Sequence, residues 1–180
     1  MINSDKQEAP VIWFTGISGS GKSTLARKVM AELQRQHIPS EFLDGDVVRE
    51  FFEGDLGYSP PERILNVKRI AFAASLLARH GITTVVANIA PYYEVRDFIR
   101  KKTARYLQIF CDASMAKVAE RDVKGHYKKH QAGALQSLVG VDDAYDRPRS
   151  PDLTVDTDRQ AVEESVQQVF ELLRAKGVMR

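Results

Sequence analysis

A glycine-rich turn near the start of the chain constrains the fold more than any other feature. Residues 16–23 read Gly-Ile-Ser-Gly-Ser-Gly-Lys-Ser and match the pattern G-x-x-x-x-G-K-[ST] at every position. An apolar run at 11–15 precedes this turn, and residues 22–35 carry apolar side chains at helical spacing. The order strand, glycine loop, helix opens a β-α-β unit and therefore predicts an α/β fold.

Each residue type in this loop has a physical task. The glycines let backbone N–H groups turn inward as a nest for phosphate oxygens, and the following helix adds its positive N-terminal end. Lys22 can neutralise the β- and γ-phosphates, and the Ser23 hydroxyl can ligate Mg²⁺. The chain has no Asn-Lys-x-Asp guanine motif, so we expect a nucleoside triphosphate other than GTP.

The remainder of the chain alternates strands with helices. The strands are apolar on both faces, which predicts a P-loop NTPase three-layer sandwich with a parallel sheet between helices. We expect one domain over 1–180, a disordered lead at 1–9 and a mobile, lid-like segment at 122–150. Expected strands are 11–15, 40–43, 83–89, 106–111 and 153–155; expected helices are 22–35, one from about 47, 61–79, 93–103, 114–121 and 160–175.

Composition narrows the partners and the compartment. With 26 Lys and Arg against 24 Asp and Glu, the net charge of +2 argues against a nucleic-acid coat protein or a polybasic membrane binder. One cysteine, Cys111, excludes an internal disulfide, and no apolar run is long enough for a signal peptide or a membrane span. We expect one soluble domain in the reducing cytoplasm.

Two carboxylates follow the second expected strand. Asp44 and Asp46 stand at the carboxyl end of that strand, where parallel sheets face their ligands. One could hold the shell of a metal ion, and the other could accept a proton from a substrate hydroxyl. The alternative is that both form a turn and cap a helix at Val47.

Basic and polar residues follow in two groups. Arg49, Arg63, Asn66 and Arg69 could bind phosphate or sulfate oxygens, or form an exposed charged face. Tyr58 could stack on a base or anchor its loop. In the second group, Arg121 and Lys124 could close over a transferring phosphoryl group, the alternative being a solvated loop. His126 and His130 lack a third ligand, so zinc is not expected.

Taken together, these residues resemble the adenylylsulfate (APS) kinase family of P-loop kinases. The matching pieces occur in family order and cover nearly the whole chain. They are residues 16–24, 43–46 with 48–49, 55–59, Arg63 with Asn66 and Arg69, 89–92 with Arg96, 121–127, 140–145 and 156–157.

The resemblance implies transfer of the γ-phosphoryl group of ATP to the ribose 3′-hydroxyl of adenylylsulfate, giving 3′-phosphoadenylylsulfate and ADP. It implies catalysis by Asp46, Lys22 and Asp44, with Mg²⁺ at Ser23 and Asp44, and a homodimer. The implied ATP-binding residues are Gly16, Ser18, Gly19, Ser20, Gly21, Lys22, Ser23, Thr24, Arg121, Asp156 and Thr157. The implied acceptor-binding residues are Asp46, Arg49, Tyr58, Arg63, Asn66, Ile89, Ala90, Lys124 and Leu138.

The chain departs from the family pattern on the acceptor side. Ala90 replaces a serine that some members use as a phosphoserine intermediate, so direct in-line transfer is expected. Leu138 replaces a phenylalanine that stacks on the acceptor adenine, a loss of about 1–3 kcal/mol. The alternatives are the same transfer to another nucleotide, such as cytidine diphosphoramidate, or an ATP-binding regulatory module without transfer.

Overall fold

The computed structural model describes residues 8–180 and centres on a parallel sheet of five strands in the order β2-β3-β1-β4-β5. In the middle of the sheet, Phe14 of β1 pairs with Ala87 of β3 on one side and with Ile109 of β4 on the other. The strands are β1 (Val11–Thr15), β2 (Ser40–Asp44), β3 (Thr83–Ala87), β4 (Tyr106–Asp112) and β5 (Leu153–Asp156). The predicted parallel sheet is therefore confirmed.

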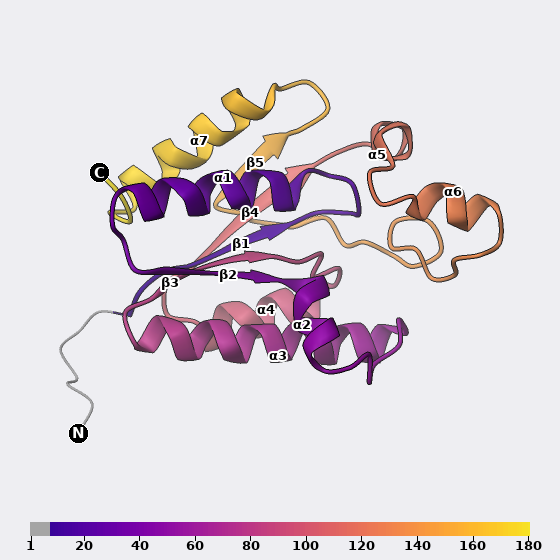
Figure 1. The fold of residues 1–180 in the computed structure, drawn as a ribbon, viewed down its shortest axis with the longest axis horizontal. Coiled ribbons are helices and arrows are strands. Elements are labelled where there is room, and N and C mark those ends of the chain that lie inside the picture. Colours follow the sequence, from indigo (N-terminus) through magenta and orange to yellow (C-terminus); the bar gives the residue numbers. More distant parts are fainter. Residues whose placement is uncertain (1–7) are drawn as a thin grey trace.

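Helices cover both faces of this sheet. In Figure 1, α1 (Lys22–Arg35) and α7 (Val162–Ala175) lie above it, whereas α3 (Pro60–Arg79) and α4 (Tyr93–Lys102) lie below. Two apolar cores result, one under α1 and α7 and one over α3 and α4. The arrangement is the three-layer sandwich that the both-face apolar strands predict.

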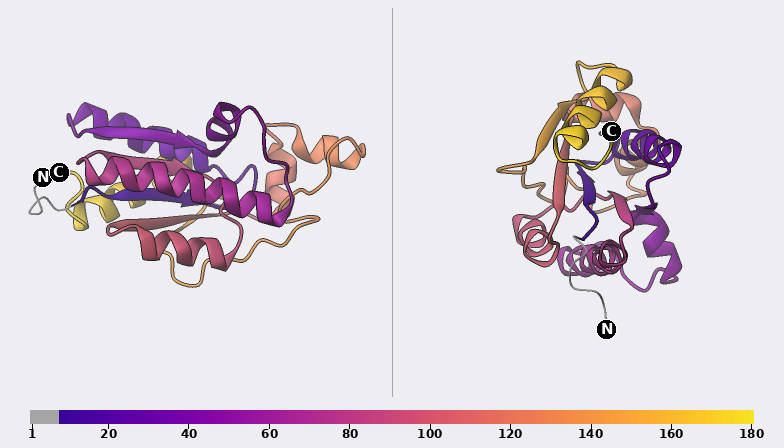
Figure 2. Two further views of the ribbon diagram at one scale, coloured as in Figure 1. Left: turned by 90° about the horizontal axis from the view of Figure 1, so that it is seen from below. Right: turned by 90° about the vertical axis from the view of Figure 1, so that its left-hand side faces the viewer.

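The carboxyl ends of the strands meet at one end of the molecule. Three short helices gather there: α2 (Gly45–Phe51), α5 (Met115–Arg121) and α6 (His126–Gln131), as Figure 1 shows at the right. The left view of Figure 2 shows that α5 and α6 extend beyond the sheet. None of the helices within residues 8–180 combines the length and apolar character needed to cross a bilayer.

Three expected boundaries are corrected. The α2 helix begins at Gly45 rather than near Val47, because the Asp44 side chain accepts the Asp46 N–H at 3.0 Å and caps the helix two residues earlier. The β3 strand ends at Ala87 rather than residue 89, and Ala90 has a φ of 42°. Of the expected disordered lead, residues 1–7 lie outside the described part, whereas Ala9 is buried and donates to the Ala78 carbonyl.

The segment expected to act as a lid packs onto the phosphate-binding loop. Tyr127 and Leu138 are buried against Ile17 of the loop and Val118 of α5. The Tyr127 hydroxyl donates to the Ser18 carbonyl at 2.9 Å. Residues 122–150 therefore contain the short helix α6 and share a small apolar cluster with the loop and α5. Their mobility stays a prediction.

A buried arginine connects the end of this segment to the turn after β3. Arg96 on α4 donates to the Ala90 carbonyl at 2.8 Å and to the Asp146 carbonyl. Its guanidinium also lies over the rings of Tyr93 and Tyr145. One cation thereby fixes both the turn after β3 and the chain that returns from the lid.

Replacing Arg96 by leucine should lower the free energy of unfolding by about 2–4 kcal/mol, because two buried carbonyls lose their donor. Urea denaturation would measure the change. The matched control, Arg100→Leu, removes a half-exposed guanidinium from the same helix and should cost less than about 1 kcal/mol. Equal losses in both variants would contradict the special role of Arg96.

Candidate active site

The glycine loop turns so tightly that side chains are excluded at its start. Gly16 has a φ of 144°, and a Cβ atom there would lie 2.5 Å from the Cys111 carbonyl oxygen. Gly21, with a φ of 92°, stands directly before α1. These conformations favour glycine, and they aim the N-terminal end of α1 at the cavity beside the loop.

A cavity of about 680 Å³ begins at this loop and extends to α3 and the 135–139 segment. It brings together most of the residues that the sequence analysis selects. Those lining it are Ser18, Gly19, Gly21, Lys22, Ser23, Thr24, Asp44, Asp46, Arg49, Tyr58, Arg63, Asn66, Ile89, Ala90, Arg121, Lys124, Leu138 and Thr157.

Three of the expected ATP-binding residues do not line the cavity. Gly16 and Ser20 lie behind the loop, where they approach each other. The Asp156 carboxylate accepts the N–H groups of Asp158 and Arg159 at 3.1 and 3.2 Å. These residues shape the turns on which the site rests instead of facing the space that a ligand would take.

Lys22 is buried at the bottom of the cavity. Its Nζ donates to the Ile17 carbonyl at 2.7 Å, and within residues 8–180 it forms no ion pair with a carboxylate. Burial, the largest influence, lowers the pKa of this lysine from 10.5 to about 8. Asp44 and Asp46 offset the cost of this charge only in part, and a phosphate group could provide a direct counter-ion.

The two aspartates have different surroundings. Asp44 accepts the Ser23 hydroxyl at 3.3 Å through one oxygen and caps α2 with the other. Asp44 therefore caps α2, as in the alternative interpretation, and also lies beside the phosphate-binding loop. Asp46 is 73% exposed in its side chain and forms an ion pair with Lys124 of the lid-like segment. Both aspartates line the cavity, and Asp46 is held there by a lysine rather than by the helix backbone.

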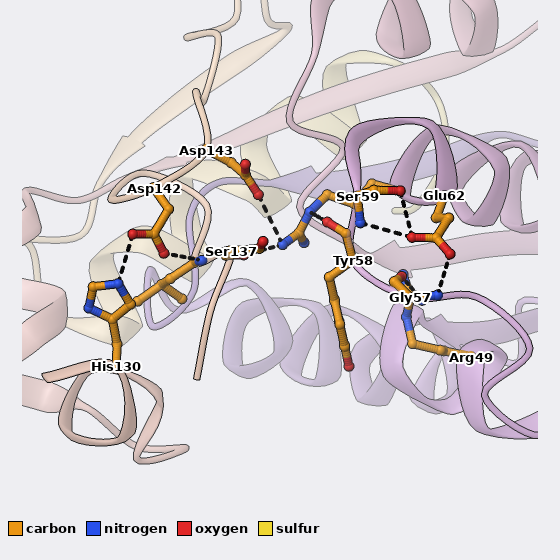
Figure 3. Close-up of polar contacts among 11 residues, drawn as sticks. Arg49, Gly57, Tyr58, Ser59, Glu62, His130, Ser137, Asp142 and Asp143 are labelled. Carbon is orange, nitrogen blue, oxygen red and sulfur yellow. Dashed lines mark hydrogen bonds and ion pairs between the residues drawn. The ribbon is translucent and has the colours of Figure 1, made fainter. Parts of the chain in front are cut away.

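On the far side of the cavity, two arginines contact one aromatic ring. The guanidinium carbons of Arg49 and Arg63 lie 4.6 and 5.3 Å from the ring centroid of Tyr58. Arg49 donates to the carbonyls of Leu56 and Gly57, and Arg63 to that of Tyr58, each at 2.8 Å. Figure 3 shows Arg49, Gly57 and Tyr58 together. These backbone bonds hold the loop before α3 in place.

Arg63 also connects the loop before α3 to the lid-like segment. It donates to the Ser137 carbonyl and lies 3.4 Å from Asp143. Next to this contact, Asp142 accepts the Leu138 N–H at 2.8 Å and contacts His130 of α6 at the same distance (Figure 3). These polar contacts connect the loop before α3 and helix α6 to the 137–143 segment.

Asn66 and Arg69 are separated by the fold despite their helical spacing. Asn66 is buried at the cavity wall, and its Oδ1 has no hydrogen-bond partner within residues 8–180. Arg69 turns outward and forms two 2.8 Å bonds with Asp55. Asn66 is therefore available to a ligand, whereas Arg69 stabilises the loop before α3.

Some cavity residues carry no signal in the sequence. Gln160, Val162 and Ser165 line it from the start of α7, where they read as an ordinary amphipathic helix. His126, considered only as a metal ligand, shares a hydrogen bond of 3.2 Å between its Nδ1 and the Ser18 hydroxyl. Burial lowers the pKa of this histidine, which favours its neutral form.

The fold and the site define a P-loop kinase: a phosphate-binding loop, an acidic side chain beside it, and a cavity that extends from the loop to α3. A family model described as adenylylsulphate kinase matches residues 8–156. The chain belongs to this family.

Relatives that align over nearly the whole chain carry the same family name. An adenylyl-sulfate kinase of Gloeothece citriformis is 41% identical over 97% of this chain and 99% of its own. One of Deinococcus deserti is 45% identical over 91% and 90%. The APS kinase of Mycobacterium tuberculosis, solved in complex with AMPPNP and APS, superposes with a TM-score of 0.89 at 36% identity, covering 94% of this chain and 99% of that one.

When a nucleoside triphosphate binds in the loop at alkaline pH, Lys22 should take up a proton. Its phosphates would raise the pKa of Lys22 from about 8, so the neutral amine present near pH 9 becomes charged on binding. Calorimetric titrations in buffers of different ionisation enthalpy would measure the uptake, which should shrink below pH 7. The control is Lys28→Met, which removes an exposed lysine from α1 and should leave the proton uptake as it is. Binding at pH 9 without proton uptake would contradict the lowered pKa.

Proposed function

We propose that this protein is an adenylylsulfate kinase, which phosphorylates the ribose 3′-hydroxyl of adenylylsulfate with Mg-ATP and so serves sulfate assimilation. The observation that carries the proposal is the single cavity in which Lys22, Asp46 and Asn66 all take part. It provides a cation for the donor phosphates, a carboxylate for the acceptor hydroxyl and an unpartnered amide oxygen for the acceptor.

Ser23 and Asp44 fit a magnesium ion. Their oxygens lie 3.3 Å apart beside the phosphate-binding loop, and hard oxygen ligands are what Mg²⁺ prefers. When bound, the ion would neutralise charge that develops on the phosphate oxygens of ATP. Arg121 and Thr157 line the same part of the cavity, where the donor nucleotide would extend.

The transfer itself needs few protein groups. The 3′-oxygen of the acceptor forms a bond to the γ-phosphorus of ATP as the bond to the β-γ bridging oxygen breaks. Asp46 accepts the proton of the hydroxyl, and ADP leaves. Lys22 neutralises the phosphates at the bottom of the cavity. Ala90 has no hydroxyl, so the phosphoryl group passes directly from donor to acceptor.

The acceptor base would meet one aromatic wall. Tyr58 lines the cavity close to two arginines, whereas Leu138 is buried with Ile17 and Tyr127 and offers only aliphatic surface. Loss of the second ring weakens the preference for adenine. A nucleotide with a smaller base, such as cytidine diphosphoramidate, is therefore the second candidate acceptor.

The deciding experiment is ADP release from the purified protein with Mg-ATP, comparing adenylylsulfate with cytidine diphosphoramidate. Turnover with adenylylsulfate at micromolar concentration supports the proposal. Turnover with the cytidine compound alone transfers the assignment to the second acceptor. ATP binding without turnover on either acceptor would favour the regulatory module instead.

Replacing Asp46 by asparagine should lower kcat by about 10²–10⁴-fold, because the proton acceptor is lost, and leave ATP binding nearly unchanged. Steady-state kinetics and nucleotide titration would measure both. Asp97→Asn, the same exchange at an exposed position on α4, is the control and should keep full activity. Near-normal turnover by the Asp46 variant would remove Asp46 as the base.

We further infer that the active protein is a homodimer in the cytoplasm. The resemblance to a family with many dimeric members supports the assembly, and the single buried thiol, Cys111, is compatible with a reducing compartment. The small net charge gives no support to a nucleic-acid or membrane partner.

A further inference from the structure

A histidine of the lid-like segment contacts the phosphate-binding loop inside the cavity. His126, the first residue of α6, lines the cavity together with Ser18 of the loop. Its Nδ1 lies 3.2 Å from the Ser18 hydroxyl oxygen. Its Nε2, on the opposite edge of the ring, has no hydrogen-bond partner within residues 8–180. One nitrogen of the imidazole is therefore available to a ligand.

The backbone around this histidine is fixed by several contacts. The Asp122 carboxylate accepts the N–H groups of Tyr127 and Lys128, each at 3.0 Å. Tyr127 is buried, and its hydroxyl donates to the Ser18 carbonyl at 2.9 Å. Because Tyr127 uses only the carbonyl of Ser18, the hydroxyl of that serine is left to His126.

Ser18 lies at the part of the loop where the last phosphate of a bound nucleotide would be. The Lys22 Nζ donates to the carbonyl of Ile17, the residue directly before Ser18. The lysine of such a loop reaches the β- and γ-phosphates. A γ-phosphoryl group that binds Lys22 would therefore lie close to Ser18 and His126.

His126 also lies near the acceptor region. Lys124, two residues earlier, forms an ion pair with Asp46, the proposed proton acceptor. Burial lowers the pKa of His126 most, and both of these charges act on it as well: Lys124 lowers this pKa and Asp46 raises it. The imidazole is thus close to the groups that would bind the donor phosphates and to the group that would take the proton.

We propose that His126 is a catalytic residue that binds the γ-phosphoryl group of ATP through Nε2. In a neutral imidazole one nitrogen accepts a hydrogen bond and the other donates one. The Ser18 hydroxyl donates to Nδ1, which places the proton on Nε2, and the Nε2–H group then donates to a γ-phosphoryl oxygen. The role of this contact in phosphoryl transfer rests on the proposed function.

A donor at this point stabilises the transfer without exchanging a proton. Negative charge is spread over the three equatorial oxygens of the transferring phosphoryl group, and a donor that is already in place needs no reorganisation. The imidazole keeps its proton, while Asp46 takes that of the acceptor hydroxyl and ADP leaves. Because ADP has no γ-phosphoryl group, the contact distinguishes ATP from ADP.

Three substitutions separate the two nitrogens of the ring. His126→Leu removes both, His126→Asn keeps a polar atom only near the position of Nδ1, and His126→Gln places an amide nitrogen near that of Nε2. The leucine and asparagine variants should bind Mg-ATP about tenfold to a hundredfold more weakly and Mg-ADP within about twofold of the wild type. The glutamine variant should retain ATP binding within about threefold. Isothermal titration calorimetry measures both affinities.

Turnover and a matched control complete the experiment. With adenylylsulfate as acceptor, His126→Leu should lower kcat by about tenfold to a hundredfold, and His126→Gln should recover most of it. The control is His80→Leu, the same exchange at an exposed residue after α3 that does not line the cavity, and it should leave both affinities and kcat unchanged. Circular dichroism checks that each variant folds.

Each outcome has a distinct meaning. Selective loss of ATP binding with recovery in the glutamine variant supports the proposal. Equal losses for ATP and ADP overturn it, because a histidine that only holds the lid-like segment on the loop would affect both nucleotides. A glutamine variant as weak as the leucine variant overturns the assignment to Nε2. A wild-type protein without turnover overturns the proposed function, whereas the comparison of ATP with ADP still decides whether His126 binds the γ-phosphate.

Discussion

The tight turn after β1 is the constraint on which the active site depends. Gly16 passes so close to the Cys111 carbonyl of β4 that no side chain fits between them. Because of this approach, α1 starts directly at the end of the sheet, with Lys22 buried beneath the loop. A residue with a side chain at Gly16 would push the loop away from β4 and take the lysine with it.

The burial of Lys22 leaves a positive charge in the site that is only partly balanced. Its charge rests on one backbone carbonyl, and its pKa of about 8 records the cost of leaving water. Asp44 and Asp46 offset this cost only in part, because Asp44 accepts hydrogen bonds from Ser23 and the α2 backbone, and Asp46 forms an ion pair with Lys124. An anion that enters the cavity gains from this imbalance, so the folded protein stores part of the binding energy for its ligand.

Much of the fold could be predicted, because apolar strands and the glycine loop are local signals. The sequence also identified Asp44 and Asp46, since both follow a strand at the ligand end of the sheet. It could not show that Arg69 turns to Asp55, because the spacing within a helix does not reveal where a loop folds back. Gln160 and Ser165 were missed for a similar reason: they reach the cavity only through the way α7 packs across the sheet.

Arg63 is shared by two parts of the molecule that would otherwise be independent. Its guanidinium holds Tyr58 in the acceptor region and the Ser137 carbonyl in the lid-like segment. Changes of substrate preference on either side will therefore be coupled through one side chain. Evolution or engineering towards a new acceptor cannot exchange the lid sequence and the pocket wall as separate modules; it has to preserve, or replace together, the contacts that meet at this arginine.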